Sequence, residues 1–181
     1  MSAPAVAAGF FGKLPARGDF VRAGLPGGFV AAWDAWLQAV LPDSRARLGE
    51  RWLAAWMEAP VWRFLLHAGQ CGPDAVLGLW MPSVDAVGRH FPLTIAAVFT
   101  GGLATHDAAW LDAAEECGRR ALETDMGPAE LAACLPMPAL AGEAGAAGWW
   151  TDGAPLVPPG RRPGGLPGPE GYAAMLAEPA P

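Results

Sequence analysis

The sequence contains very little lysine. Of its twelve basic residues, Lys13 is the only lysine, and the arginines are scattered along the 181-residue chain. The acidic residues outnumber the basic ones and give a formal net charge of −6. Binding to a phosphate backbone requires a concentrated basic surface, so the composition argues against a nucleic-acid-binding protein. No stretch reaches about eighteen uninterrupted apolar residues, so we do not expect direct insertion into a membrane.

Cysteine is also scarce. Cys71, Cys117 and Cys134 are odd in number, far apart and without a C-x-x-C pair. The first residues lack the basic region and the long apolar segment of a secretory signal peptide. We therefore expect a cytoplasmic protein whose cysteines are reduced and fill core positions.

Metal-ligand motifs are missing as well. His67, His90 and His106 fall in different predicted elements, and the sequence has no H-E-x-x-H and no paired Cys and His ligands. We therefore predict no metal site and no cofactor.

Apolar and aromatic residues, in contrast, are abundant. They make up 52% of the chain and include nine tryptophans, although there is only one tyrosine. Large aromatic rings mostly leave water on folding or lie at contact surfaces. With this length, the composition predicts one folded domain with a substantial core.

Apolar periodicity predicts both helices and strands. Helical spacing follows Pro26 and ends before Pro42, and Ser44 is placed to cap the next helix. Short apolar runs bounded by turn residues are typical of strands. The predicted helices are 29–41, 44–59, 107–124, a short one starting at 128 and one or two turns within 169–176; the predicted strands are 9–14, 61–68, 75–81, 92–99 and 148–153.

The three central runs favour a three-stranded antiparallel meander over residues 61–99. Their near-continuous apolar character requires cover on both faces of the sheet. We therefore predict an α+β fold, an α/β sandwich with a mainly antiparallel central sheet flanked by helices, as a single domain over residues 1–181. The Pro/Gly-rich segments near 136–147 and 158–168 are expected to be loosely structured.

The first of two polar blocks is GKLPARGDF, residues 12–20. It is not a phosphate-binding loop, because Lys13 is followed by leucine and proline instead of Ser or Thr. One interpretation is a turn in which Gly18 adopts an unusual backbone conformation and Asp19 accepts hydrogen bonds from nearby N–H groups. The other is a binding role for Lys13 and Arg17, and the two are compatible.

The second block is PSVDAVGRHFPL, residues 82–93. Here Asp85 is placed to form an Asx-turn and Gly88 to take a positive φ. Arg89 then either pairs with an acidic neighbour or binds a carboxylate or phosphate. Ser83, Asp85 and His90 do not predict a hydrolytic triad, because no G-x-S-x-G elbow is present and the three lie too close together on one hairpin.

Together the two blocks resemble the TagF (ImpM) family of bacterial type VI secretion-associated proteins. The segments WDAWL, APVWRF and a late WW followed by GLP extend the likeness in order from about residue 9 to 176. The resemblance implies a cytoplasmic accessory protein that is not an enzyme. It further implies a post-translational negative regulator of type VI secretion that binds the forkhead-associated scaffold protein of that system.

The resemblance supplies matching positions but no catalytic assignment for them. We expect their polar side chains to converge on one face beside the sheet and to form an interaction surface or a structural motif. An alternative is an enzyme or small anionic-ligand binder that uses Lys13, Asp19, Ser83, Asp85 and Arg89. A third possibility is self-association, so the oligomeric state stays open. The candidate residues are Lys13, Arg17, Gly18, Asp19, Ser83, Asp85, Gly88 and Arg89.

Overall fold

The computed structural model describes residues 4–140 and 142–179. Within these residues, seven strands form one antiparallel sheet in the order β2-β1-β5-β4-β3-β6-β7. The predicted meander is confirmed as the neighbours β3, β4 and β5. The strands are β1 (Ala5–Gly12), β2 (Val21–Ala23), β3 (Trp62–Leu66), β4 (Ala75–Met81), β5 (Leu93–Thr100), β6 (Gly148–Thr151) and β7 (Gly160–Pro163).

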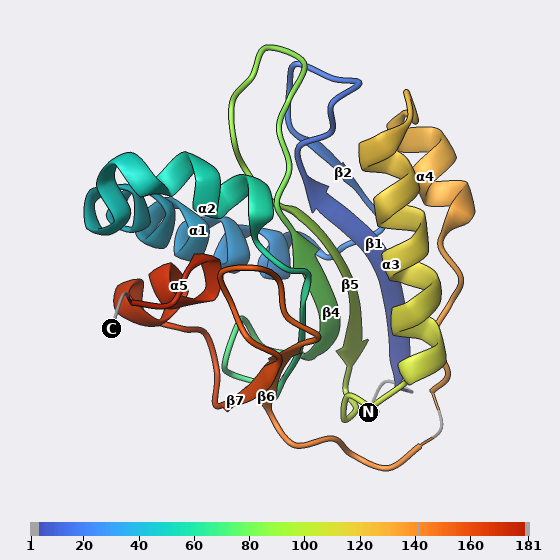
Figure 1. The fold of residues 1–181 in the computed structure, drawn as a ribbon. Coiled ribbons are helices and arrows are strands. Elements are labelled where there is room, and N and C mark those ends of the chain that lie inside the picture. The colour runs from blue at the N-terminus through green and yellow to red at the C-terminus, as the bar shows by residue number, and fades with distance from the viewer. Residues whose placement is uncertain (1–3, 141, 180–181) are drawn as a thin grey trace.

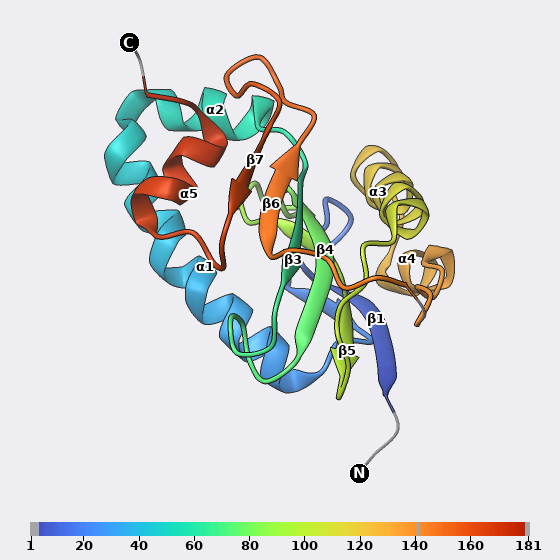
Figure 2. The same cartoon turned by 90° about the horizontal axis from the view of Figure 1, so that it is seen from below.

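Helices cover both faces of this sheet, as predicted. Figures 1 and 2 show α1, α2 and α5 on one face and α3 and α4 on the other. In the described part of the chain, no helix combines the length and the apolar character that crossing a membrane requires. The helices are α1 (Gly27–Leu48), α2 (Trp52–Glu58), α3 (Ala108–Glu123), α4 (Pro128–Cys134) and α5 (Pro169–Leu176), with a 3₁₀ turn over Gly49–Arg51.

Each helical layer packs on its own core. Alternation along β3 sends Trp62 and Phe64 toward α1 and α5, and sends Leu65 toward α3. The first core is rich in aromatic rings, and its Trp33 indole N–H donates to the Thr94 hydroxyl at 2.8 Å. The second core is mainly aliphatic. The α+β fold predicted from the sequence is therefore what the structure shows.

The prediction of two helices separated at Pro42 is wrong. Helix α1 continues through Pro42 to Leu48, and Gly49, with φ of 53°, ends it. Pro42 has no N–H to donate to the carbonyl of Gln38, four residues earlier. Both residues are exposed to solvent, so the loss of this one hydrogen bond does not end the helix. Ser44 is therefore not a cap: it is buried in the helix, donates to the Leu41 carbonyl at 2.7 Å and accepts from an indole N–H.

The edges of the sheet also differ from the prediction. Strand β1 begins four residues earlier than expected, at Ala5, and the short β2 forms where no strand was predicted. The predicted strand near Trp149 is β6, which pairs with β3. Residues 160–163, in a segment expected to be loosely structured, form β7 and pair with β6. Strand β2 has only three residues and β7 has no alternating apolar pattern, so periodicity misses both.

The prediction that all three cysteines are reduced core residues holds only for Cys71, which is free and buried. Cys117 on α3 and Cys134 at the end of α4 form a disulfide. Their spacing along the chain gave no sign of this pairing, which depends on α4 folding back beside α3 (Figure 2).

Candidate functional site

The two polar blocks lie side by side at one end of the sheet. Strand β1 ends at Gly12, β4 ends at Met81 and β5 starts at Leu93. Because β1 and β4 both pair antiparallel with β5, these three positions lie at the same end of the sheet. The loops 13–20 and 82–92 therefore emerge together, as Figure 1 shows above the sheet. The expected convergence of polar side chains holds for Lys13, Ser83, Asp85 and Arg89, whereas the side chains of Arg17 and Asp19 do not join them.

The centre of this arrangement is the carboxylate of Asp85. One oxygen, Oδ2, accepts from Lys13 Nζ at 2.6 Å and from Arg89 Nε at 2.7 Å. The other, Oδ1, accepts from the backbone N–H groups of Val87 at 3.0 Å and Arg89 at 2.9 Å. The predicted Asx-turn is confirmed, and so is the pairing of Arg89 with an acidic neighbour. We call Lys13, Ser83, Asp85 and Arg89 the two-loop cluster.

The cluster holds a buried charge in its ionised form. The Asp85 side chain has no exposed surface and that of Lys13 is 6% exposed. Burial by itself would raise the pKa of Asp85, but the hydrogen bonds from Lys13 and from Arg89 and Val87 hold it well below its usual range. The ammonium group of Lys13 also lies 4.6 Å from the centre of the Phe20 ring, a cation–π contact.

Further hydrogen bonds join the two loops. The hydroxyl of Ser83 donates to the carbonyl of Lys13 at 2.7 Å, and the Ala86 N–H donates to the carbonyl of Arg17 at 2.8 Å. Arg89 donates across to the carbonyl of Gly18 while its side chain stays 61% exposed. Each loop therefore fixes the conformation of the other.

Glycine is required at one of the two predicted turn positions only. Gly88 has a φ of 88°, a conformation that favours glycine, and its N–H donates to the Asp85 carbonyl at 3.0 Å. Gly18 does not have a positive φ, so the expectation of an unusual backbone there is wrong. Asp19 and Arg17 lie at the exposed surface, outside the hydrogen bonds around Asp85.

The cluster lacks the arrangement that nucleophilic catalysis needs. A catalytic serine requires a base within hydrogen-bond reach, but the Ser83 hydroxyl donates to a backbone carbonyl. The His90 ring packs edge-on against the rings of Trp52 and Trp56, with centres 5.5 and 6.2 Å away. Burial and then the charge of Arg45 lower the pKa of His90. The arrangement supports a structural clamp with exposed cationic groups.

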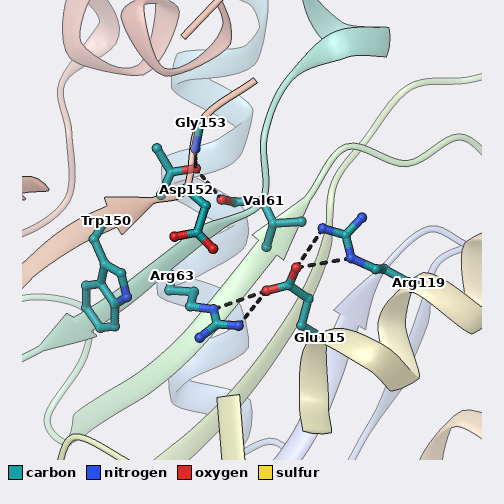
Figure 3. A pocket seen from close by; sticks show the side chains of 8 residues that line it. Val61, Arg63, Glu115, Arg119, Trp150, Asp152 and Gly153 are labelled. Atoms are coloured by element: carbon teal, nitrogen blue, oxygen red, sulfur yellow. Dashed lines mark hydrogen bonds and ion pairs between the residues drawn. The ribbon is translucent and has the colours of Figure 1, made fainter. Parts of the chain in front are cut away.

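A second polar site was missed by the sequence analysis. It lies between β3, α3 and the end of β6, and Figure 3 shows its side chains. Glu115 accepts from Arg63 at 2.8 Å and from Arg119 at 2.6 Å, and Arg63 also donates to Asp112 at 2.8 Å. The pocket has a volume of about 90 Å³ and is also lined by Trp150. We call Arg63, Asp112, Glu115 and Arg119 the β3–α3 cluster.

Electrostatically, the β3–α3 cluster is largely satisfied internally. Burial would lower the pKa of Arg63, but the hydrogen bonds that it donates to Glu115 and then to Asp112 raise this pKa overall. The only sign of this cluster in the sequence was the alternation along β3, which puts the side chains of Arg63 and Phe64 on opposite faces of the sheet. It could not reveal the partners of Arg63, because they lie about fifty residues away on α3. Across residues 4–140 and 142–179, His, Cys, Asp and Glu side chains nowhere gather in a group of three suited to a metal ion.

Comparison with known proteins places the chain in a family. The model of the TagF N-terminal domain, described as type VI secretion system-associated, matches residues 9–137. The chain belongs to the TagF N-terminal domain family. The crystal structure of PA0076 from Pseudomonas aeruginosa PAO1 superposes with a TM-score of 0.83 at 32% sequence identity, covering 98% of this chain and 96% of that one. A search of curated proteins gives no match.

The matched region contains the whole two-loop cluster. Both polar blocks lie between residues 9 and 137, and so do the strands that carry them, apart from the first four residues of β1. Strands β6 and β7 and helix α5 follow the matched region but complete the sheet and the aromatic core. The chain is therefore a type VI secretion-associated protein whose two polar blocks are hydrogen-bonded to each other at one end of the sheet.

Proposed function

We propose that this protein is a non-enzymatic, cytoplasmic accessory protein that restrains type VI secretion after translation by binding the forkhead-associated scaffold protein of that system. Membership of a type VI secretion-associated family supports the setting. One observation carries the choice of a binding role. The carboxylate of Asp85, where the two polar blocks meet, accepts four hydrogen bonds from within the protein.

A carboxylate with these four partners is a poor general base. Its lone pairs are occupied, and its proton affinity is reduced because two cations face it. The loops instead present their outer groups, among them Arg89 and the apolar Val87, which is 70% exposed. Groups fixed in place and turned to solvent suit recognition of another protein, since little conformational entropy is lost on binding.

The competing function is an enzyme or small anionic-ligand binder at Lys13, Asp19, Ser83, Asp85 and Arg89. Such a site normally lies in a concave pocket with convergent polar groups that are free to bind. Here Lys13 and Ser83 direct their polar atoms at each other's loop, and Asp19 is exposed and takes no part in the cluster's hydrogen bonds. These contacts favour the binding role.

Co-purification tests the proposal directly. The chain and the scaffold protein encoded in its own gene neighbourhood would be produced together, and a tag on the scaffold would recover both. We expect wild type to co-purify and to lower secretion when it is overproduced in the parent bacterium. The proposal is wrong if wild type shows neither effect.

A variant then tests the part played by the loops. Arg89→Ala removes an exposed cation, and circular dichroism and thermal unfolding would first establish that the variant is folded. Loss of scaffold binding in folded Arg89→Ala supports recognition through the loop end. Unchanged binding would keep the regulator but move its contact surface elsewhere on the protein.

A further inference from the structure

The disulfide between Cys117 and Cys134 joins the two helices on one face of the sheet. Cys117 lies on α3 and Cys134 is the last residue of α4, and the two are separated by 17 positions in the sequence. Figure 2 shows α4 folded back beside α3. The bond therefore holds the C-terminal end of α4 against α3.

The two sulfur atoms of this bond differ in their access to solvent. Cys117 is buried, with 4% of its surface exposed, whereas Cys134 is half-buried. Cys134 also lines an open hollow of about 600 Å³ in the surface of the protein. A thiol in solution must reach a disulfide sulfur directly in order to react with it. Cys134 is therefore the sulfur that such a thiol meets.

The groups around the bond can also stabilise the two reduced cysteines. Nη1 of Arg120 lies 3.7 Å from Sγ of Cys134, and a cation at this position favours a thiolate. Sγ of Cys117 lies 3.1 Å from the carbonyl oxygen of Cys134, which can accept a hydrogen bond from the S–H of an open bond. Asp125 and Glu130 line the same hollow, so its charge does not select an anionic thiol over a neutral one.

Helix α4 keeps other attachments when the bond is open. Leu131 is fully buried in the aliphatic core, and Glu130 accepts from the N–H of Gly127 at 2.8 Å at the start of the helix. Beyond the end of the helix, the indole of Trp110 donates to the carbonyl of Pro136 at 2.8 Å. We therefore expect reduction to loosen the C-terminal end of α4 and to leave the domain folded.

The start of α4 touches the first polar block. The guanidinium group of Arg17 lies so close to Gly127 that a methyl group placed on this glycine would come within 2.8 Å of Nη2. The carbonyl of Arg17 in turn accepts from the N–H of Ala86 in the second block. Helix α4 thus connects the disulfide to the end of the sheet where the two polar blocks meet.

We propose that the Cys117–Cys134 bond is a reversible thiol–disulfide switch, which a low-molecular-weight thiol opens by attack on Cys134 and which controls the mobility of α4. This inference rests on the proposed function for its setting only, because cytoplasmic proteins rarely keep a structural disulfide and use such bonds mainly as transient or redox-sensing ones. The access to Cys134 and the contacts of the two sulfur atoms support it independently.

The reaction balances with two molecules of thiol. The thiolate of the first attacks Sγ of Cys134, the bond to Cys117 breaks, and Cys117 leaves as a thiolate that takes a proton from solvent. The second thiolate attacks the sulfur of the first thiol, and Cys134 leaves as a thiolate beside Arg120. Two electrons pass to the protein, and the two thiols end as one disulfide. The oxidised thiol reverses both steps.

A redox titration tests whether the bond is reversible. Native wild type would be equilibrated with glutathione at graded ratios of reduced to oxidised form, quenched with acid, unfolded and labelled with a maleimide for mass spectrometry. We expect a passage from disulfide to dithiol within these ratios. A bond that persists in excess reduced glutathione until urea unfolds the protein is structural, and this result would overturn the proposal. A protein that stays reduced in excess oxidised glutathione would overturn it as well.

Alkylation of the reduced, native protein shows which sulfur reacts. With limiting iodoacetamide, we expect Cys134 to be labelled at least about tenfold faster than Cys117. Cys71 is the internal control, because it is 3% exposed and burial raises the pKa of its thiol to about 11. Equal labelling of Cys117 and Cys134 would contradict attack at Cys134.

Arg120→Gln tests the cation beside Cys134. We expect the alkylation of Cys134 to slow about threefold and its pH profile to move to higher pH, because the thiolate loses a stabilising charge. Arg119→Gln is the matched control, since it removes the same charge from the preceding position, where the side chain pairs with Glu115. The role given to Arg120 is wrong if its variant keeps the wild-type profile or if both variants shift equally.

Hydrogen exchange tests the connection from the bond to α4. We expect reduced wild type to exchange the amides of α4 at least about tenfold faster than the oxidised protein, with those of β4 unchanged. The double variant Cys117→Ser/Cys134→Ser should exchange like reduced wild type in either buffer. Equal exchange of α4 in the two states would show that the bond controls no movement, and the switch would be wrong. These measurements use the protein alone, so a failure to bind the scaffold would overturn the proposed function without changing their outcome.

Discussion

The two ion-pair clusters share one chemical plan but differ in how they are built. In each, a carboxylate lies between two cations: Asp85 between Lys13 and Arg89, and Glu115 between Arg63 and Arg119. In the two-loop cluster the carboxylate also accepts two backbone N–H groups. In the β3–α3 cluster it bonds only to side chains.

This difference assigns different roles to similar contacts. The two-loop cluster fixes backbone conformation at the end of three strands, so its loss would release both loops. The β3–α3 cluster joins a strand and a helix that the aliphatic core already holds together. Ion pairs contribute to a fold according to burial and backbone contacts, and their number alone is a poor guide.

The largest expected effect comes from removing the buried cation. Lys13→Met leaves the buried Asp85 carboxylate with one cationic partner, and we expect the free energy of unfolding to fall by about 3 kcal/mol. Urea unfolding at neutral pH measures it. Arg119→Met is the matched change in the β3–α3 cluster and should cost about 0.5 kcal/mol, because Arg119 is half-exposed. Similar losses in the two variants would remove the distinction between the clusters.

Acid should act next most strongly, and through Asp85. The folded state lowers the pKa of this carboxyl, so its contribution is complete above the unfolded value of about 3.9 and is lost as the pH falls below it. We expect the unfolding free energy of wild type to decrease more between neutral pH and pH of about 3 than that of Asp85→Asn, which has no carboxyl to protonate. Parallel pH profiles for the two proteins would contradict the linkage.

A smaller effect is expected from Glu115→Gln. The amide keeps the size of the side chain but offers one acceptor where two guanidinium groups now bond, so we expect a loss of about 1 kcal/mol. Asp112 still holds Arg63, which limits the damage. The measurement is again urea unfolding, and a loss equal to that of Lys13→Met would show that the β3–α3 cluster carries the same weight as the two-loop cluster.

The predictability of the two clusters differs for a physical reason. Asp85, Gly88 and Arg89 are near neighbours in sequence, so turn chemistry predicts their local contacts. The antiparallel pairing of β1 with β5 then places Lys13 at the same end of the sheet. The pairing of Arg63 with Glu115 depends on how α3 crosses the sheet, which no local pattern specifies.

The same distinction explains the outcome for the fold. Apolar periodicity predicted α3, which buries one face, and short apolar runs between turn residues predicted the central strands, which are buried on both faces. It failed at Pro42, where a solvent-facing proline interrupts one hydrogen bond without ending α1. It also failed at β7, whose residues are mostly exposed and are held by pairing with β6. Short strands at the edge of a sheet with mostly exposed residues leave little trace in a hydrophobic pattern.

The smallest effect should come from Asp112→Asn. The Asp112 side chain is 70% exposed and shares Arg63 Nη2 with Glu115, so its charge is screened by water and its partner stays paired. We expect a loss below about 0.5 kcal/mol in low salt that disappears in high salt. The comparison of urea unfolding at the two salt concentrations is informative because Glu115, on the same helix, is largely shielded from solvent. The loss of stability caused by Glu115→Gln should therefore persist in high salt. If the loss caused by Asp112→Asn persists equally, the difference in exposure does not separate the two carboxylates.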